Sequence, residues 1–275
     1  MRKREFVFSV FTAIILLCSC RTHRYIYSPP PHNIPYFQEK GDSKLTAYYS
    51  GGFDNESNEG FDIQAAYAIT DHFAVAGAYS GRSEKNIYPY AAHSPYNTNI
   101  FDSSVVQYTR SMIEISAGWF TPLNKKRTIT YNLYGGFGLG KFSIQDAGLD
   151  SAGKNYNRSY SNDLSKIFLE GGFNFMPSKN FHFSLSGTLS WVHYGNNTSS
   201  YTSRELQYFY LDKITNQTLF FYEPALNFQI GLRKWLKLDI TETLCSALPE
   251  NYPATRTFMQ SVGLTVDLSK IGRLK

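Results

Sequence analysis

The sequence predicts an all-β protein, a closed antiparallel up-and-down transmembrane β-barrel of about ten strands, and three observations lead to this prediction. From about residue 44 onward, apolar residues alternate with small polar ones, and a period of two indicates strands with unlike faces. Most of the alternating runs have the nine or more residues that a tilted membrane strand needs. Their connections are alternately short and long, which is typical of membrane barrels with tight turns on one side.

The first nineteen residues have the order of a secretory signal: a basic start, an apolar run over residues 6–17, and a small residue, Ser19, before Cys20. The apolar run is too short for a helical span, which needs about 20 residues. Residues 1–19 are therefore predicted to be cleaved. Leu17 to Cys20 resemble the bacterial lipobox, and this resemblance implies a lipoprotein acylated at Cys20. The alternative is an ordinary signal peptide with two incidental cysteines.

Residues 20–43 follow as a Pro-rich stretch with Pro29, Pro30, Pro31 and Pro35, without helical or strand period. We expect a lipidated, partly extended tether here. At about 3.3 Å per residue, some twenty residues reach tens of ångströms, which is enough to separate Cys20 from the barrel wall.

The barrel itself is expected over residues 44–275, and the alternation is clearest over residues 181–191, where Phe183, Leu185 and Leu189 share one face. Counting runs gives ten strands, within a range of eight to twelve, at residues 44–53, 60–69, 73–82, 104–121, 128–144, 165–176, 181–194, 219–232, 235–247 and 255–268. An even strand count brings both ends of the chain to one side. The short turns assign that side to the periplasm, so we expect both termini there and the barrel in the cell outer membrane.

A soluble lipocalin-like barrel on a lipid anchor would show the same alternation with its apolar face inward. The polar face here consists mainly of Ser, Thr, Gly, Ala and Asn, whereas a water-exposed sheet face carries more Lys and Glu. Small, weakly polar groups suit a narrow barrel interior. Aromatic residues, 16% of the chain, recur near the strand ends, as the girdles of a membrane barrel require. These features favour the membrane barrel.

Two segments carry a family resemblance. Residues 60–82 (GFDIQAAYAITDHFAVAGAYSGR) resemble the hairpin that opens many small outer-membrane barrels of the Bacteroidetes. Residues 261–268 (SVGLTVDL) resemble the last-strand β-signal that barrel-assembly machinery reads, although the chain continues to Lys275 and lacks a terminal aromatic residue. The resemblance implies a barrel inserted by that machinery among outer-membrane lipids, and it implies no particular activity.

Five charged residues fall on predicted inward faces, where acids and bases can pair: Glu114, Glu170, Arg233, Lys237 and Asp239. Buried charges are tolerated when they are paired, so a structural lumen network is expected. A proton- or ion-conducting path and a carboxylate active site are the alternatives.

His193, near the outer end of its strand, is the candidate for a rim-site enzyme acting on lipid or peptide, because a His-assisted nucleophile needs a nearby Ser such as Ser190 or Ser199 and Ser200. Serine is abundant in this chain, and no catalytic constellation emerges. A non-enzymatic protein is therefore the first hypothesis.

Residues 150–152 (Asp-Ser-Ala) resemble the short site at which Bacteroidetes attach O-glycans, which would place a glycan on Ser151. Loops rich in Tyr, Asn and Ser can contact a surface ligand.

After signal cleavage Cys245 is the one free thiol, so neither a disulfide framework nor a cysteine zinc site can be drawn, and no cofactor is expected. The formal charge of +5 gives no inference toward nucleic acid. The expected role is structural, surface-interacting or in small-solute passage.

Overall fold

The computed structural model describes residues 24–33, 35–51, 57–88, 103–149, 154–178, 180–248 and 255–271. The predicted signal, the predicted acylation site Cys20 and the predicted glycan site Ser151 lie outside these residues. None of the described helices is long and apolar enough to cross a membrane.

The described chain is almost entirely strand, and the expected strands appear close to their predicted positions. Their bounds are β1 Ser43–Gly51, β2 Ser57–Ala68, β3 Phe73–Tyr88, β4 Ser103–Pro122, β5 Ile129–Leu149, β6 Asn155–Ser178, β7 Phe181–Ser199, β8 Gln217–Arg233, β9 Leu236–Leu244, β10 Ser246–Leu248 and β11 Phe258–Asp267. Short helices lie at α2 (Ser203–Tyr208), η1 (Leu211–Ile214) and α3 (Leu268–Ile271).

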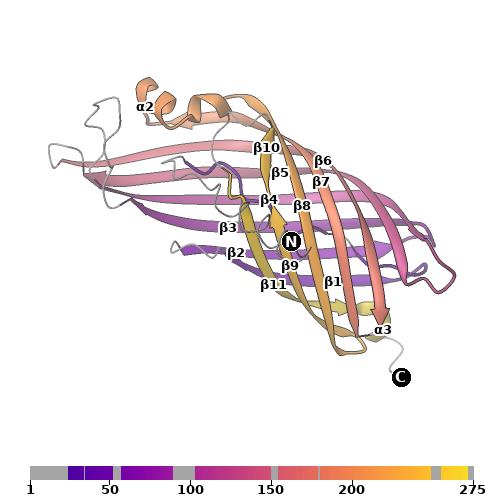
Figure 1. Cartoon of the computed structure of the whole chain (residues 1–275). Helices are drawn as coiled ribbons and strands as arrows, with labels where there is room; N and C mark the ends of the chain where they lie inside the picture. Colours follow the sequence, from indigo (N-terminus) through magenta and orange to yellow (C-terminus); the bar gives the residue numbers. More distant parts are fainter. Residues whose placement is uncertain are drawn as a thin grey trace, which may run out of the picture.

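The strands form one closed antiparallel barrel (Figure 1). Each strand from β1 to β8 pairs with the next, β8 pairs with β9, β9 pairs with β11, and β11 returns to β1. β10 continues β9 after Cys245 and pairs with the same neighbour, β8. β9 and β10 therefore count as one strand of the wall, and the barrel has ten strands. The predicted fold class is confirmed.

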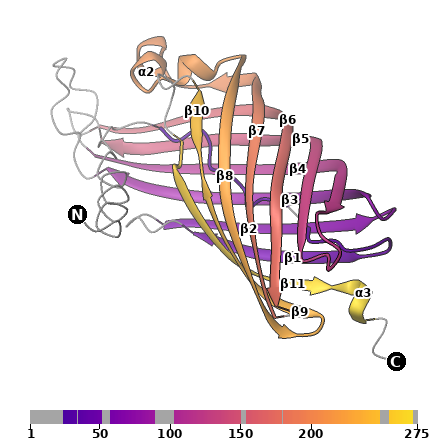
Figure 2. The same ribbon diagram turned by 45° about the vertical axis from the view of Figure 1, so that its right-hand side comes forward.

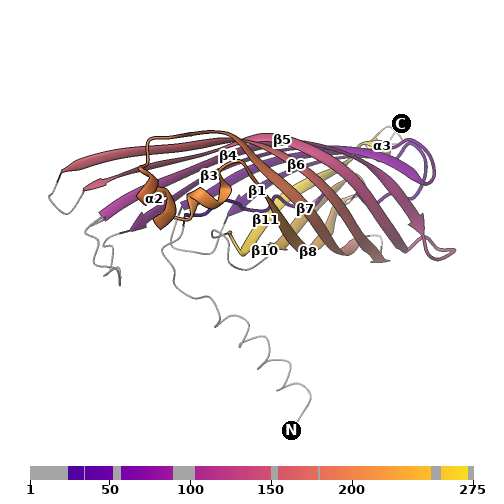
Figure 3. The same cartoon turned by 90° about the horizontal axis from the view of Figure 1, so that it is seen from above.

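The two ends of the barrel differ in their connections. The turn end carries the short links β2–β3, β4–β5, β6–β7 and β8–β9, together with the start of β1 and helix α3. The loop end carries the longer links, among them the segment with α2 and η1 between β7 and β8. Figures 2 and 3 show α2 and α3 at opposite ends of the molecule.

The wall is apolar outside and polar inside. On β7, Leu185 is 52% exposed and Leu189 is 36% exposed, whereas Ser184, Ser186 and Ser190 are buried. A soluble barrel would need the opposite arrangement, because its apolar face would have to leave water. The lipocalin-like alternative is therefore wrong for this chain.

The strands differ greatly in length. β4, β5 and β6 have 20, 21 and 24 residues, whereas β1, β9 and β11 have 9, 9 and 10. A tilted strand crosses a bilayer with about 9–11 residues, so the longest strands continue about as far again beyond it. The continuation is at the loop end, where β3–β6 reach past β1, β2 and β11 in Figure 1.

The alternation inverts along these long strands. On β5, Leu133, Phe137 and Leu139 point outward and are exposed. Beyond Gly140 the outward positions are Lys141, Ser143 and Gln145, and the apolar residues Phe142 and Ile144 point inward and are buried. The same switch separates outward Ile113 from inward Met112 on β4, and outward Ile167 from inward Leu164 on β6.

We call the region with the apolar outside the belt, and the continuation of the long strands with α2 and η1 the projecting part. The projecting part encloses an aromatic-rich core that includes Leu211 and Ile214 of η1, and Leu206 and Tyr208 of α2 pack against it. Its buried residues are Ile26, Tyr27, Val106, Tyr108, Met112, Phe142, Ile144, Tyr160, Leu164, Val192, Tyr194, Tyr201, Phe209, Leu211, Ile214, Leu219, Phe221 and Cys245. The projecting part thus has its apolar side chains inside and its polar side chains outside, as in a water-soluble barrel. The belt has the opposite arrangement, which suits a hydrocarbon environment.

Candidate functional site

The Pro-rich segment does not lie outside the barrel as a tether. We call its described residues, 24–33 and 35–42, the plug, because most of them are buried against the inner wall. The plug is extended, as expected, but it enters at the loop end and leaves at the turn end. The segment was expected to separate Cys20 from the barrel wall, but its described residues lie against the inside of that wall, because its aromatic residues pack among inward side chains.

The plug is fixed at the loop end by a buried ion pair. Arg24 Nη2 lies 2.6 Å from Asp146 Oδ2 on β5, and the Arg24 guanidinium covers the ring of Phe209. The hydroxyl of Tyr201 donates to the same carboxylate oxygen over 3.1 Å. Burial, reinforced by Asp146, raises the pKa of Tyr201, so the phenol keeps the proton that it donates.

Tyr27 is the central side chain of the plug. Its ring stacks on Phe221 with 4.4 Å between centroids. Its hydroxyl donates to Glu223 over 3.1 Å and accepts from Lys166 over 3.2 Å. Lys166 also lies 3.0 Å from Glu114 and 3.8 Å from Glu223, so one ammonium pairs with two buried carboxylates where the plug meets β4, β6 and β8.

Few backbone contacts hold the plug. Tyr27 forms one isolated parallel bridge with Thr255, and the Arg256 amide donates to the Tyr27 carbonyl over 2.8 Å. Nearby, Ser28 donates to Glu84, which also accepts from Arg256 Nε at 3.0 Å. The plug is therefore held mainly by side chains, whereas the wall is held by continuous backbone pairing.

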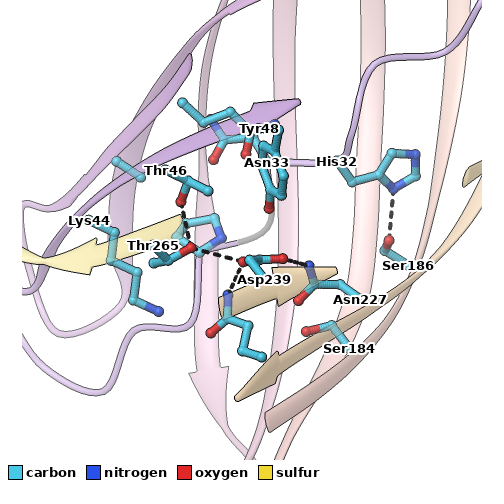
Figure 4. A pocket seen from close by; sticks show the side chains of 14 residues that line it. His32, Asn33, Lys44, Thr46, Tyr48, Ser184, Ser186, Asn227, Asp239 and Thr265 are labelled. Carbon is cyan, nitrogen blue, oxygen red and sulfur yellow. Dashed lines mark hydrogen bonds between the residues drawn. The ribbon is translucent and has the colours of Figure 1, made fainter. Parts of the chain in front are cut away.

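The middle of the plug contacts the polar lumen of the belt. His32 Nδ1 lies 2.7 Å from the Ser186 hydroxyl. Figure 4 marks this hydrogen bond with a dashed line. Gln64 donates to the Pro31 carbonyl over 2.6 Å, and Asn33 donates to the Gly77 carbonyl over 3.2 Å. Side chains and a backbone carbonyl of the wall thus satisfy polar groups that the plug buries.

At the turn end the plug is attached to two turns. The Tyr36 hydroxyl donates to the Arg127 carbonyl over 2.5 Å, and the rings of Phe37 and Phe120 lie 5.6 Å apart. The Lys40 amide donates to Asp71 over 2.9 Å in the β2–β3 turn. With Arg24 among the projecting strands and Phe37 at the turns, the plug crosses the whole belt.

The described chain therefore has its first residue near the loop end and its last, in α3, at the turn end. This differs from the expectation that both ends lie on one side, because the plug passes back through the barrel before β1 begins.

Four of the five predicted network residues face the lumen, in two separate groups. Glu114 and Glu170 belong to the first, where Lys166 pairs with Glu114 and Thr188 donates to Glu170 over 3.3 Å. Lys166 and Glu223, which sequence reasoning missed, complete this group; both lie on the inward parity of their strands.

The second group surrounds Asp239. This buried carboxylate accepts from Thr265 over 2.9 Å, from Gln229 over 2.7 Å and from Asn227, as Figure 4 shows for Asn227 and Thr265. Lys237 lies deeper toward the turn end. Arg233 joins neither group: it is exposed, because a register shift between Gly231 and Arg233 breaks the alternation before the turn.

The His193 ring and its neighbouring serines are not brought together. His193 Nδ1 lies 3.0 Å from the Thr218 hydroxyl on the outer face, whereas Ser190 faces inward and donates to Glu223 over 2.5 Å. Ser200 accepts from the Ser159 amide. In the described parts of the chain, no group of three or more His, Cys, Asp or Glu side chains is arranged to hold a metal ion.

The plug leaves little room inside the belt. Cavities between the plug and the wall measure about 10 Å³ beside Asn33, about 20 Å³ beside His32 and about 70 Å³ at the turn end. One water needs about 10–15 Å³ of such volume, so each of the first two has room for about one water. The fold and the lumen together define a transmembrane β-barrel of the outer-membrane type, with ten strands and an internal segment.

Comparison with known proteins adds no family to this class. No protein-family model matches the chain. No curated protein matches it either.

Solved barrels are similar at low identity. The translocator domain of the autotransporter NalP from Neisseria meningitidis has a TM-score of 0.43 at 11% identity, covering 83% of this chain and 89% of that chain. The transport unit of the autotransporter AIDA-I from Escherichia coli has 0.39 at 11%, covering 95% and 96%. A major outer membrane protein from Thermus thermophilus has 0.35 at 9%, covering 82% and 98%. At these values the likeness carries no argument about activity, and the description of the fold rests on this chain's own strand pairing.

Proposed function

We propose that this protein is an outer-membrane β-barrel lipoprotein, sealed by its own N-terminal segment, that acts at the cell surface in a structural or ligand-contacting role. One observation carries the proposal: the plug crosses the belt and joins the core of the projecting part. A barrel filled in this way offers no open path, so solute passage requires the plug to move.

The lipid anchor is inferred to lie on the loop side. Cys20 is four residues from Arg24, which is held at the loop end by Asp146. Four residues reach about 14 Å when extended, enough to bring an acyl group from the mouth of the barrel to the nearer leaflet. Long loops mark the outer surface of such barrels, so this leaflet is the outer one. A surface anchor replaces the periplasmic anchor that strand parity alone suggests.

A non-enzymatic role is supported by the partners of the candidate catalytic groups. His193 contacts a threonine on the outer face, and the lumen carboxylates are engaged with Lys166 or with hydroxyl and amide groups. The partners that we propose are outer-membrane lipid, the assembly machinery during insertion, and a surface ligand at the loop end. A glycan on Ser151 stays a prediction.

The orientation is tested with two single-cysteine variants. Arg204→Cys lies on α2 at the loop end and Lys125→Cys in the β4–β5 turn, and both positions are exposed. In intact cells a membrane-impermeant maleimide is expected to label Arg204→Cys only, and Lys125→Cys after outer-membrane permeabilisation. The native Cys245 thiol is buried and serves as the unlabelled background. The reverse labelling pattern would overturn the orientation.

The anchor and the seal have their own readouts. An epitope inserted directly after Arg21 is expected to bind antibody on intact cells, and binding only after permeabilisation would place the anchor in the periplasm. Purified wild-type protein inserted into planar bilayers is expected to give no ionic current. Steady wild-type currents would show that the lumen conducts with the plug in place.

A further inference from the structure

The turn end of the lumen holds a cavity of about 70 Å³ with an unusual set of side chains. Lys44 from β1, His182 from β7 and Lys237 from β9 all line it, and each is more than nine-tenths buried. The plug lines another side with Tyr36, Gln38, Glu39 and Asp42. The rest of the lining is Met176, Asp267, Ser269 and Lys270. Three strands and the plug therefore bring two buried ammonium groups and an imidazole to one space, with the exposed Lys270 at its edge.

The ammonium group of Lys44 has no hydrogen-bond partner within the described residues. Two aromatic rings lie near this positive charge. Lys44 Nζ is 5.2 Å from the ring centroid of Tyr36 and 5.7 Å from that of Phe37. Lys237 Nζ contacts only neutral acceptors, His182 Nδ1 at 3.2 Å and Gln229 Oε1 at 3.5 Å. No carboxylate lies within 4 Å of either ammonium in the part of the chain that the structure describes.

His182 adds a directed donor. Because Lys237 donates to Nδ1, the ring proton of the neutral imidazole is on Nε2. Nε2 is buried and has no partner among the described side chains. The ring is held in place against Tyr36, with 4.9 Å between the ring centroids.

Glu39, Asp42 and Asp267 line this mouth, and the two aspartates are already engaged. Asp267 accepts from Lys270 over 2.7 Å and from Ser269 over 2.6 Å. Asp42 accepts from the backbone amides of Gln38 and Glu39. Neither carboxylate is therefore placed to neutralise the two buried lysines by direct contact.

We propose that this cavity binds a small oxyanion with a phosphate or carboxylate group, held by Lys44, Lys237 and His182 Nε2. An unpaired buried ammonium is costly, and an anion that accepts its hydrogen bonds removes that cost. The volume admits a small oxyanion or a few waters and excludes a larger molecule. The ligand is a free solute that enters through the turn end, because lipid headgroups lie outside the wall.

The test is calorimetric titration of the full-length protein with inorganic phosphate in a phosphate-free maltoside detergent, with acetate as the second probe. The variants are Lys44→Met and Lys237→Gln. The matched control is Lys141→Met, which removes an exposed lysine from the outside of the projecting part. Heat-modifiable gel migration establishes that each variant is folded.

Wild type and Lys141→Met are expected to bind one phosphate with equal affinity, and each lumen variant to bind about 10- to 100-fold more weakly, since each removes a charge-assisted hydrogen bond. Without phosphate, Lys44→Met is expected to melt at a higher temperature than wild type, because it removes an unpaired buried charge. Folded wild type that shows neither binding heat nor a melting shift with either anion at millimolar concentration would overturn the proposal. Unchanged affinity in Lys44→Met would do the same.

Discussion

The belt and the projecting part are built from the same strands but obey opposite rules. Along β5, Phe137 faces hydrocarbon and is 51% exposed, whereas Phe142, five residues later, is 2% exposed and packs in an aromatic core. Backbone pairing continues without interruption between them. Strand geometry therefore determines only that successive side chains point to opposite faces of the wall. Whether the outward or the inward side chains are apolar depends on the medium outside that stretch, hydrocarbon or water.

The plug follows the same division. Its first part, with Ile26 and Tyr27, belongs to the apolar core of the projecting part. Its middle part, with His32 and Asn33, contacts hydroxyls and carbonyls in the belt. The plug thus changes from apolar to polar side chains at the level where the inner face of the wall does. It therefore connects the filled lumen of the belt with the core of the projecting part.

The largest effect is expected from truncating the inner core. Phe142→Ala should cost about 3–5 kcal/mol, since it leaves a cavity among buried aromatic residues. Phe137→Ala on the same strand should cost less, about 1.5–3 kcal/mol, because it loses the transfer of the ring from water to hydrocarbon but leaves no cavity where lipid chains fill the space. Urea unfolding of the protein refolded into vesicles measures both free energies. Equal losses would contradict the division between belt and projecting part.

A charge placed on the outer face gives the reciprocal test. Leu169→Arg, near the middle of the belt on β6, should cost about 2–4 kcal/mol. Asn157→Arg is exposed on the outward parity of the same strand in the projecting part, and it should change stability by no more than about 0.5 kcal/mol. The same unfolding experiment compares them. A similar cost for both variants would place the water boundary elsewhere on β6.

The smallest effect is expected at the junction of plug and projecting part. Tyr201→Phe removes the phenol that donates to Asp146, and the loss should be about 1.5 kcal/mol because Arg24 still pairs with that carboxylate. Hydrogen exchange of the projecting strands measures it. Exchange as slow as in wild type would show that this hydrogen bond does not stabilise the junction.

Much of the wall could be predicted from the sequence. Runs such as residues 181–194 show their faces directly, because side chains on a strand alternate whatever the strand pairs with. The inversion on β5 was also present in the sequence, since Leu139 and Phe142 are three residues apart and so lie on opposite faces. The boundaries at the loop end were underestimated because the prediction kept one apolar parity throughout.

The sequence by itself determined the alternation, the number of strands and the tight turns, all of which are local consequences of period and turn composition. Only the tertiary structure decided that the Pro-rich segment fills the lumen, that Lys166 and Glu223 meet around Tyr27, and that Lys44 is left without a counter-ion. These contacts join residues such as Tyr27 and Glu223, which are 196 positions apart. No local pattern encodes such pairs, because they exist only once the barrel has closed around its own chain.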